Sequence, residues 1–317
     1  MTIQIEPDPA PFHRLPGDAA LNVTALFLRA SDGVRLRLAL WGSDAPRGTV
    51  LLFPGRTEYL EKYAEIGAEL AAAGWQVLGI DWRGQGMSDR LLPDPRPGHI
   101  GDFAAYQTDV EAMVAVGERL DLPRPWHLLA HSMGGAIGLR ALTEGLPVER
   151  AVFSAPMWGI LHKGLPRRVV DGVVGAALRL GRGGAHAVGT GGGGTFVLDC
   201  AFRNNLLTGD GQRWGRLVAE AAAWPDLTLG GASYAWLGAA LAECDRLAAL
   251  AAPPIPALIS LGSLERVVSP TAIRARTARW PEAALHEVPG GQHEVMFETP
   301  DRRQDFLRAL SAFLAQE

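Results

Sequence analysis

The sequence has few cysteines, no long apolar run and no excess of basic charge, and each deficit excludes a class of protein. Its two cysteines, Cys200 and Cys244, are too few for a disulfide framework and have no spacing typical of a zinc site. No stretch reaches the roughly 18 uninterrupted apolar residues of a membrane-spanning helix. The formal net charge of −4 gives no general attraction to nucleic acid. We therefore expect neither a bound metal nor a nucleic-acid partner.

The N-terminus also lacks the basic segment and apolar core of a secretory signal. With free thiols, this predicts a soluble protein of the cytoplasm. Hydrophobic residues still make up 48% of the 317 residues, enough for a substantial core in one large α/β domain or two smaller ones. Prolines recur through residues 1–22, which we expect to form an arm on the surface.

From residue 23 onward, short apolar segments alternate with segments compatible with helices. Residues 24–29 and 34–41 predict an antiparallel hairpin at a sheet edge, because the second segment alternates apolar and basic residues. Six later segments are expected as strands of a mostly parallel sheet with helices between them: residues 49–53, 75–80, 126–131, 151–154, 256–261 and 284–288. Of these, residues 49–53 and 151–154 are expected to be buried, because they are apolar without alternation.

A serine directly follows the strand expected at residues 126–131. Ser132 lies two residues from Ala130 and two from Gly134, and a helix-compatible segment begins behind it. Small residues at these positions predict a nucleophile elbow, since that tight strand-to-helix turn brings two backbones together. The helix start offers N–H groups to an oxyanion, so the Met133 N–H is a candidate donor. An ordinary buried serine in a strand-to-helix loop is the alternative.

The loop after residues 49–53 contains Gly55 and is the expected place for a second oxyanion donor. We assign that role to the backbone N–H of Arg56, paired with that of Met133. A plain turn is the alternative for this loop. Glu58, at the start of the following helix, is a tentative substrate contact.

An acid and a histidine follow two of the later strands. Glu265 falls in the loop after residues 256–261, and His293 falls in the loop after residues 284–288. The order serine, acid, histidine, each in its own loop at the carboxyl side of a sheet, is expected of a Ser-His-acid triad. We therefore predict that Ser132, Glu265 and His293 act together in catalysis.

Between residues 156 and 240 the alternation of strands and helices stops. Residues 167–179 place apolar side chains at helical spacing, and we expect them to pack against the rest of the protein; an interfacial helix that contacts lipid is the sharper alternative. Trp158, Tyr234 and Trp236 are candidates for the wall of an acyl-chain tunnel or for the core of this segment. The glycine-rich residues 181–194 have no preceding strand, so we reject a dinucleotide site and expect a mobile lid loop or hinge.

Five segments carry motifs in a fixed order: residues 53–59, 81–88, 130–135, 262–268 and 290–294. In order and spacing they resemble the lysophospholipase and monoacylglycerol lipase branch of the α/β-hydrolases. The resemblance implies a mostly parallel central sheet with helices on both faces and an inserted helical cap. It divides the chain into an arm (1–22), a first core part (23–155), the cap (156–240) and a second core part (241–317). Two departures are Phe53-Pro54-Gly55, where the branch often has His-Gly, and Glu265, where it usually has Asp.

The resemblance also implies a reaction: hydrolysis of the carboxylic ester of a lysophospholipid or monoacylglycerol through an acyl-enzyme, without a cofactor. A general carboxylesterase acting on short soluble esters is the alternative, and a non-catalytic binding protein of the same fold is a third reading that the triad disfavours. A dehalogenase is disfavoured because it uses Asp at the position of Ser132. If the cap contacts the inner membrane, the protein would be a peripheral membrane protein on the cytoplasmic side. The oligomeric state is left open.

Overall fold

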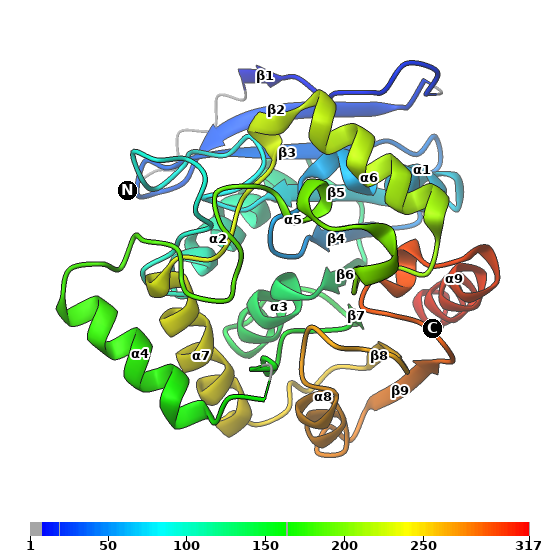
Figure 1. Cartoon of the computed structure of the whole chain (residues 1–317). Helices are drawn as coiled ribbons and strands as arrows, with labels where there is room; N and C mark the ends of the chain where they lie inside the picture. The colour runs from blue at the N-terminus through cyan, green and yellow to red at the C-terminus, as the bar shows by residue number, and fades with distance from the viewer. Residues whose placement is uncertain (1–7, 19, 163, 317) are drawn as a thin grey trace.

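The computed structural model describes residues 8–18, 20–162 and 164–316 (Figure 1). Its strands are β1 (Asp8–Ala10), β2 (Val23–Arg29), β3 (Arg35–Trp41), β4 (Thr49–Phe53), β5 (Gln76–Asp81), β6 (Trp126–His131), β7 (Arg150–Ser154), β8 (Ala257–Gly262) and β9 (Ala283–Val288). Its α-helices are α1 (Ala64–Ala72), α2 (Ala105–Arg119), α3 (Met133–Thr143), α4 (Arg167–Arg179), α5 (Phe196–Asp199), α6 (Gly211–Ala223), α7 (Tyr234–Ala249), α8 (Pro270–Thr277) and α9 (Pro300–Leu314).

Within the described residues the nine strands form one sheet, in the order β1-β2-β3-β5-β4-β6-β7-β8-β9. The pairs from β1 to β5 are antiparallel, which confirms the predicted hairpin of β2 and β3. The hairpin does not lie at the sheet edge as predicted, because β1 adds to β2 on the outer side. The pairs from β5 through β9 are parallel, as expected for an α/β-hydrolase. Parallel pairing brings the carboxyl ends of β4, β6 and β8 to one edge, so the loops that carry the candidate catalytic residues can meet there.

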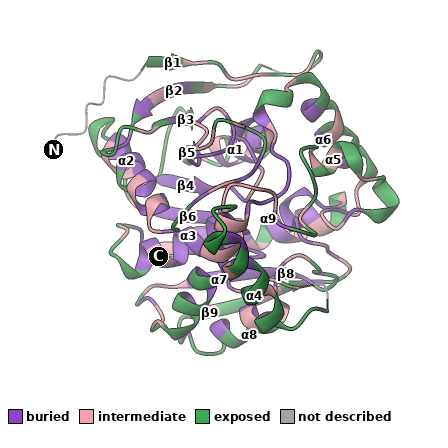
Figure 2. Cartoon of the chain, turned by 60° about the vertical axis from the view of Figure 1, so that its left-hand side comes forward, coloured by how far each residue is buried: buried purple, intermediate pink, exposed green. Residues whose placement is uncertain are grey.

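Helices cover both faces of the sheet, as predicted. On one face Ile66 of α1 and Phe306 of α9 pack in a common apolar cluster, and on the other face Met113 of α2 and Ile137 of α3 belong to a second cluster. Every residue of β4 is buried, which explains why this strand is continuously apolar. Figure 2 shows the same pattern, with the buried central strands inside a shell of exposed helix faces.

The chain between β7 and β8 forms the inserted cap, in which α4 packs beside α7 and α5 beside α6 (Figure 1). The cap helices continue to the end of α7, beyond the expected boundary at residue 240. Val174 and Ala177 of α4 are buried, whereas Val169 and Val173 remain 44% and 47% exposed. The apolar stripe of α4 therefore packs only in part. Across the described ranges, no helix is both long and apolar enough to cross a membrane.

The described part of the expected arm at residues 1–22 lies at the surface, and it contains a strand that was not predicted. Asp8–Ala10 form β1, which pairs with β2 at the edge of the sheet. An edge strand offers unpaired backbone groups, and proline is tolerated there, so a proline-rich segment can add to it. Asp18 also accepts hydrogen bonds from Arg216 of α6, at 2.7 and 2.9 Å. Residues 1–7 of the expected arm lie outside the described residues.

Candidate active site

Ser132 occupies a sharp turn between β6 and α3. Its backbone has φ 49° and ψ −116°, a conformation that is unfavourable for a residue with a side chain. Hydrogen bonds hold the turn on both sides, since the Ser132 N–H donates to Ser154 O at 3.0 Å and the Met157 N–H donates to Ser132 O at 2.8 Å. This geometry is that of a nucleophile elbow, which raises a hydroxyl above the carboxyl edge of the sheet.

Gly134 has no side chain because the loop after β4 passes directly against it. A Cβ at this position would lie 2.2 Å from the carbonyl oxygen of Phe53 and 2.5 Å from that of Pro54. Neither backbone atom can move without displacing the end of β4. The small residue two positions after the serine is therefore needed to bring the expected oxyanion loop beside the elbow.

The structure brings Ser132, His293 and Glu265 together from three loops. His293 Nε2 lies 3.0 Å from Ser132 Oγ, and His293 Nδ1 lies 2.7 Å from Glu265 Oε2. The other carboxylate oxygen, Glu265 Oε1, accepts the backbone N–H groups of Val267 at 2.5 Å and Val268 at 3.1 Å. With Nδ1 donating to the carboxylate, Nε2 is free to accept the serine proton, which is the tautomer that a general base requires.

Burial and pairing act on the histidine and its acid in opposite directions. Burial lowers the pKa of His293, but the Glu265 carboxylate outweighs it, so the pKa is raised above the usual value. Burial raises the pKa of Glu265, but His293 and the two backbone N–H groups outweigh it, so that pKa is lowered. The acid thus remains ionised and stabilises an imidazolium beside it.

The loop that carries Arg56 is held by side chains from three directions. The Gly55 N–H donates to Glu58 Oε2, Gln85 Nε2 donates to Gly55 O at 2.8 Å, and Trp82 Nε1 donates to Pro54 O at 2.9 Å. Met133, on the other side, is the first residue of α3, so its N–H precedes the hydrogen-bond ladder of the helix. Both N–H groups assigned to the oxyanion hole thus belong to backbone segments that face each other across Gly134.

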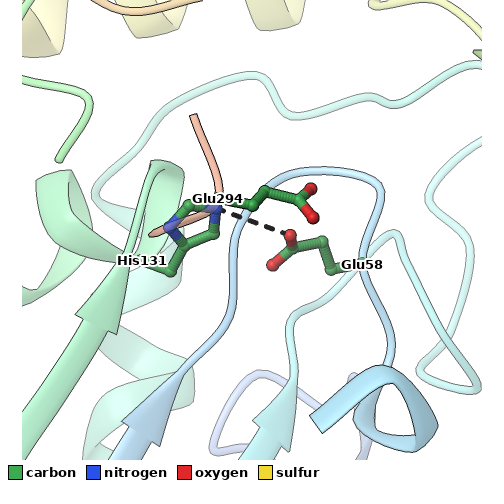
Figure 3. Close-up of side chains that lie close together, drawn as sticks. All are labelled: Glu58, His131 and Glu294. Carbon is green, nitrogen blue, oxygen red and sulfur yellow. Dashed lines mark ion pairs between the residues drawn. The ribbon is translucent and has the colours of Figure 1, made fainter. Parts of the chain in front are cut away.

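Beneath this loop lies a buried group of charged side chains. Figure 3 shows Glu58, His131 and Glu294 converging from separate segments of the chain. One oxygen of each carboxylate lies 2.6 Å from Lys62 Nζ. Burial would lower the pKa of Lys62, but the two carboxylates raise it, and Lys62 in turn helps to lower the pKa of Glu58 to about 2 against the effect of burial. One ring nitrogen of His131 and one carboxylate oxygen each of Glu58 and Glu294 lie within 4.8 Å of one another, as the ligands of a metal ion would. Here the Lys62 ammonium supplies the positive charge between the two carboxylates.

His131 precedes Ser132 and lies beside His293, but it does not bond to Ser132, His293 or Glu265. Its ring centroid is 4.9 Å from that of His293, and its Nδ1 lies 3.0 Å from Ser154 O. Burial lowers its pKa to about 3, so the ring is neutral near neutral pH. An uncharged ring at this place contacts His293 without opposing its protonation.

A cavity of about 530 Å³ opens above Ser132 and His293, between the sheet edge and the cap. This volume is in the range of small-molecule sites. Of the four tentative substrate contacts, Glu58 and Trp236 line the cavity. Many of the other lining residues are apolar and come from the cap and the loops around it: Met157, Ile160, Leu161, Phe196, Val197, Leu206, Leu207, Leu217, Leu229, Leu237, Val267 and Val268.

The other two tentative contacts, Trp158 and Tyr234, do not line the cavity, which corrects those predictions. The Trp158 indole is buried against Trp280 and donates to Gly135 O at 3.0 Å, so it belongs to the core beside α3. Tyr234 precedes Trp236 by two residues on α7. Because residues two apart on a helix point to nearly opposite sides, only one of the pair can face the cavity.

A cap segment that carries no catalytic motif holds the histidine loop in place. The backbone N–H groups of His293 and Glu294 donate to Leu206 O and Leu207 O at 3.4 and 2.8 Å. Asn205 shapes this segment, since its buried side chain accepts the N–H groups of Leu207 and Thr208. We did not predict this contact; the one sequence signal for it is the turn-forming asparagine before two leucines.

Comparison with known proteins agrees with this geometry. A family profile described as serine aminopeptidase, S33, matches residues 44–300. Lysophospholipase L2 of Escherichia coli K12 is 32% identical over 296 residues, which cover 89% of this chain and 84% of that protein. Probable lysophospholipase L2 of Haemophilus influenzae is 29% identical over 274 residues, which cover 86% and 85% of the two chains.

Two solved structures share the fold at lower identity. Monoglyceride lipase from Saccharomyces cerevisiae, a soluble variant with a substrate analogue, aligns with a TM-score of 0.74 at 17% identity, over 96% of this chain and 99% of that chain. Monoacylglycerol lipase from Paleococcus ferrophilus aligns with a TM-score of 0.68 at 23% identity, over 88% and 98%. At these identities the two structures support the fold assignment.

Proposed function

The chain belongs to the serine aminopeptidase S33 family of α/β-hydrolases, and we propose that it hydrolyses the carboxylic ester of a monoacyl lipid. One observation carries the proposal: a largely apolar cavity ends at a serine that is hydrogen-bonded to a histidine and, through it, to a carboxylate. The relatives named lysophospholipase L2 span most of the chain and support a lysophospholipid or a monoacylglycerol as the substrate class.

In the proposed reaction, Ser132 Oγ attacks the ester carbonyl while His293 Nε2 takes the hydroxyl proton. Glu265 holds the imidazole in the required tautomer and stabilises its charged form. His293 then gives the proton to the departing glycerol oxygen, and an acyl-enzyme remains on Ser132. Water attacks the acyl-enzyme with His293 as the base, which releases the fatty acid and restores the serine.

The oxyanion that forms in each half of the reaction is proposed to bind the backbone N–H groups of Arg56 and Met133. Each donor of this kind contributes about 3 kcal/mol to transition-state stabilisation. The hydrogen bonds from Gln85 and Trp82 to the loop support this assignment, because they hold the Arg56 segment in position before substrate arrives. A donor that is already in place stabilises charge without the cost of reorganisation.

We test the substrate class with p-nitrophenyl esters from acetate to palmitate, and with lysophosphatidylcholine and a monoacylglycerol. If the cavity holds an acyl chain, rates should rise with chain length and both lipids should be cleaved. Activity confined to the short esters would instead assign the protein as a general carboxylesterase. Labelling by a fluorophosphonate probe that requires Ser132 would exclude the non-catalytic binding protein.

A finer part of the proposal is that the cap contacts the inner-membrane surface from the cytoplasm. Apolar side chains exposed by at least 40% are concentrated in the cap; they include Leu165, Val169, Val173, Leu178, Leu180, Val188, Phe196, Leu198 and Phe202. On α4, a largely exposed helix, these apolar residues lie between arginines at the two ends of the helix (Figure 2). An amphipathic, basic surface of this kind favours anionic lipid. The contact would place the cavity entrance near its substrate.

A further inference from the structure

The guanidinium of Arg56 lies against two residues that line the active-site cavity, Trp236 and Gly230. Arg56 itself lines this cavity together with Ser132 and His293. Its guanidinium lies over the Trp236 ring, 4.9 Å from the centroid, and Nη2 donates to Gly230 O at 3.1 Å. Nε has no hydrogen-bond partner among the described residues, and none of the ion pairs found there includes Arg56.

Two other buried arginines of this protein serve as a comparison, because both are paired with carboxylates. Arg37 bonds Glu61 and Asp81, and Arg303 bonds Glu69 in a two-pronged contact. Such pairing offsets the large cost of removing a charge from water. Arg56 has an aromatic face and one carbonyl in place of a counter-charge, so its charge is available to a ligand.

Arg276 and Arg90 also lack a carboxylate partner among the described residues, but neither lines the cavity. Arg276 donates to main-chain carbonyls that include Leu250 O, and Arg90 donates to Asp226 O at 2.7 Å. These contacts join segments of the protein to each other. Arg56 therefore differs from them in position, because it lies in the wall that a substrate would touch.

The cavity has acidic groups as well, yet they leave the Arg56 charge uncompensated. Glu58 and Glu294 each pair with Lys62 Nζ, at 2.6 Å, and neither forms an ion pair with Arg56. Asp199 also lines the cavity, but no ion pair joins it to Arg56. Burial lowers the pKa of Arg56 to about 10, so the guanidinium is still protonated at neutral pH. An anionic group of the substrate would stabilise it.

We propose that the Arg56 side chain binds the phosphodiester of a lysophospholipid head group and thereby favours lysophospholipids over uncharged monoacylglycerols. This inference depends on the proposed ester hydrolysis. The backbone of the same residue is assigned to the ester oxyanion, and the glycerol carbons separate ester and phosphate by a chain about as long as an arginine side chain. A guanidinium is suited to this role because its planar fork matches the oxygens of a phosphate.

The test compares 1-oleoyl-lysophosphatidylcholine with 1-oleoylglycerol in the same detergent micelles. The measured quantity is the ratio of kcat/KM for the phospholipid to kcat/KM for the uncharged lipid, which cancels any common loss from a disturbed loop. In Arg56→Met we expect the ratio to fall about tenfold or more, because charge-assisted hydrogen bonds to the phosphate are lost. Arg56→Lys should retain part of the ratio, since it keeps the charge and loses the fork. The matched control, Arg90→Met, should keep the ratio of the unaltered enzyme.

A ratio that stays within about twofold in Arg56→Met would overturn the inference, and so would an equal fall for both lipids. A second arm measures inhibition of p-nitrophenyl butyrate hydrolysis by sn-glycerol 3-phosphate and by inorganic phosphate. Inhibition by the glycerol ester that weakens about tenfold in Arg56→Met supports the head-group site. Equal inhibition by both anions, with an unchanged ratio of the two kcat/KM values, would indicate a site for free anions and would overturn the inference. If the unaltered enzyme cleaves neither lipid, the proposed function fails, and the inhibition arm still tests Arg56.

Discussion

Replacing Glu265 with glutamine tests the arrangement of the triad most sharply, because the substitution keeps the size of the side chain and removes only its charge and one acceptor. In the unaltered protein Oε1 accepts the N–H groups of Val267 and Val268, and Oε2 accepts the N–H of His293 Nδ1. A carboxamide has a single acceptor oxygen. If that oxygen keeps the two backbone donors, the NH₂ group faces Nδ1, which must then be unprotonated.

The proton of the neutral imidazole would then lie on Nε2, and a protonated Nε2 cannot accept the hydroxyl proton of Ser132. We therefore expect Glu265→Gln to lower kcat by about 10³- to 10⁴-fold, or about 4 to 5.5 kcal/mol in activation free energy. The pH profile should change as well. His293 acts as a base only when neutral, so kcat/KM falls as the pH drops through its pKa. The Glu265 carboxylate raises that pKa above the usual value while burial lowers it, so the acidic limb should move to lower pH in the variant.

The assay is hydrolysis of p-nitrophenyl butyrate from pH 5 to 9, with circular dichroism to confirm that each variant is folded. Glu287→Gln is the matched control, because Glu287 pairs with Arg274 on the surface and should affect neither kcat nor the acidic limb. A loss of less than tenfold, or an acidic limb that stays in place, would refute the assignment of Glu265. The search would then turn to another carboxylate near the histidine.

Two further predictions concern stability and the cap. Lys62→Met leaves two buried carboxylates without their counter-charge, so urea denaturation should show a free energy of unfolding lower by about 3 to 5 kcal/mol. Arg274→Met removes an exposed ion pair and should lower it by at most about 1 kcal/mol. Equal effects of the two substitutions would contradict the role of Lys62. Val173→Glu in α4 should weaken sedimentation with anionic vesicles, whereas Leu120→Glu, equally exposed on the body of the protein, should not; unchanged binding in the α4 variant would remove the membrane contact.

The sheet and the triad candidates could be predicted because both depend on local patterns. Continuous apolar runs such as β4 indicate strands that are buried on both faces, and parallel strands bring their carboxyl ends to one edge. Ser132 and Glu265 follow buried strands of this kind, and His293 follows the partly exposed edge strand β9, so the order of the loops was enough to group them. The resemblance to the family indicated which of the loops carry the triad candidates.

The cavity wall could not be predicted in the same way, because it depends on how the cap packs. Trp236 faces the cavity and Tyr234 does not, and the sequence spacing alone leaves open which of them points inward. Arg56 was expected to contribute only its backbone. Its side chain meets Gly230 and Trp236, which follow it by more than half of the chain, so the surroundings of the guanidinium become visible only in the folded protein.

The most direct test of the account is the release of free fatty acid from lysophosphatidylcholine by the unaltered protein and by Ser132→Ala. Ser31→Ala, in the exposed turn between β2 and β3, is the matched control. We predict that the unaltered protein and the control release fatty acid at equal rates, whereas folded Ser132→Ala shows only a residual rate, lower by about 10⁶-fold. Release by Ser132→Ala at a rate close to that of the unaltered protein would contradict the assignment of Ser132 as the nucleophile, and with it the proposed mechanism.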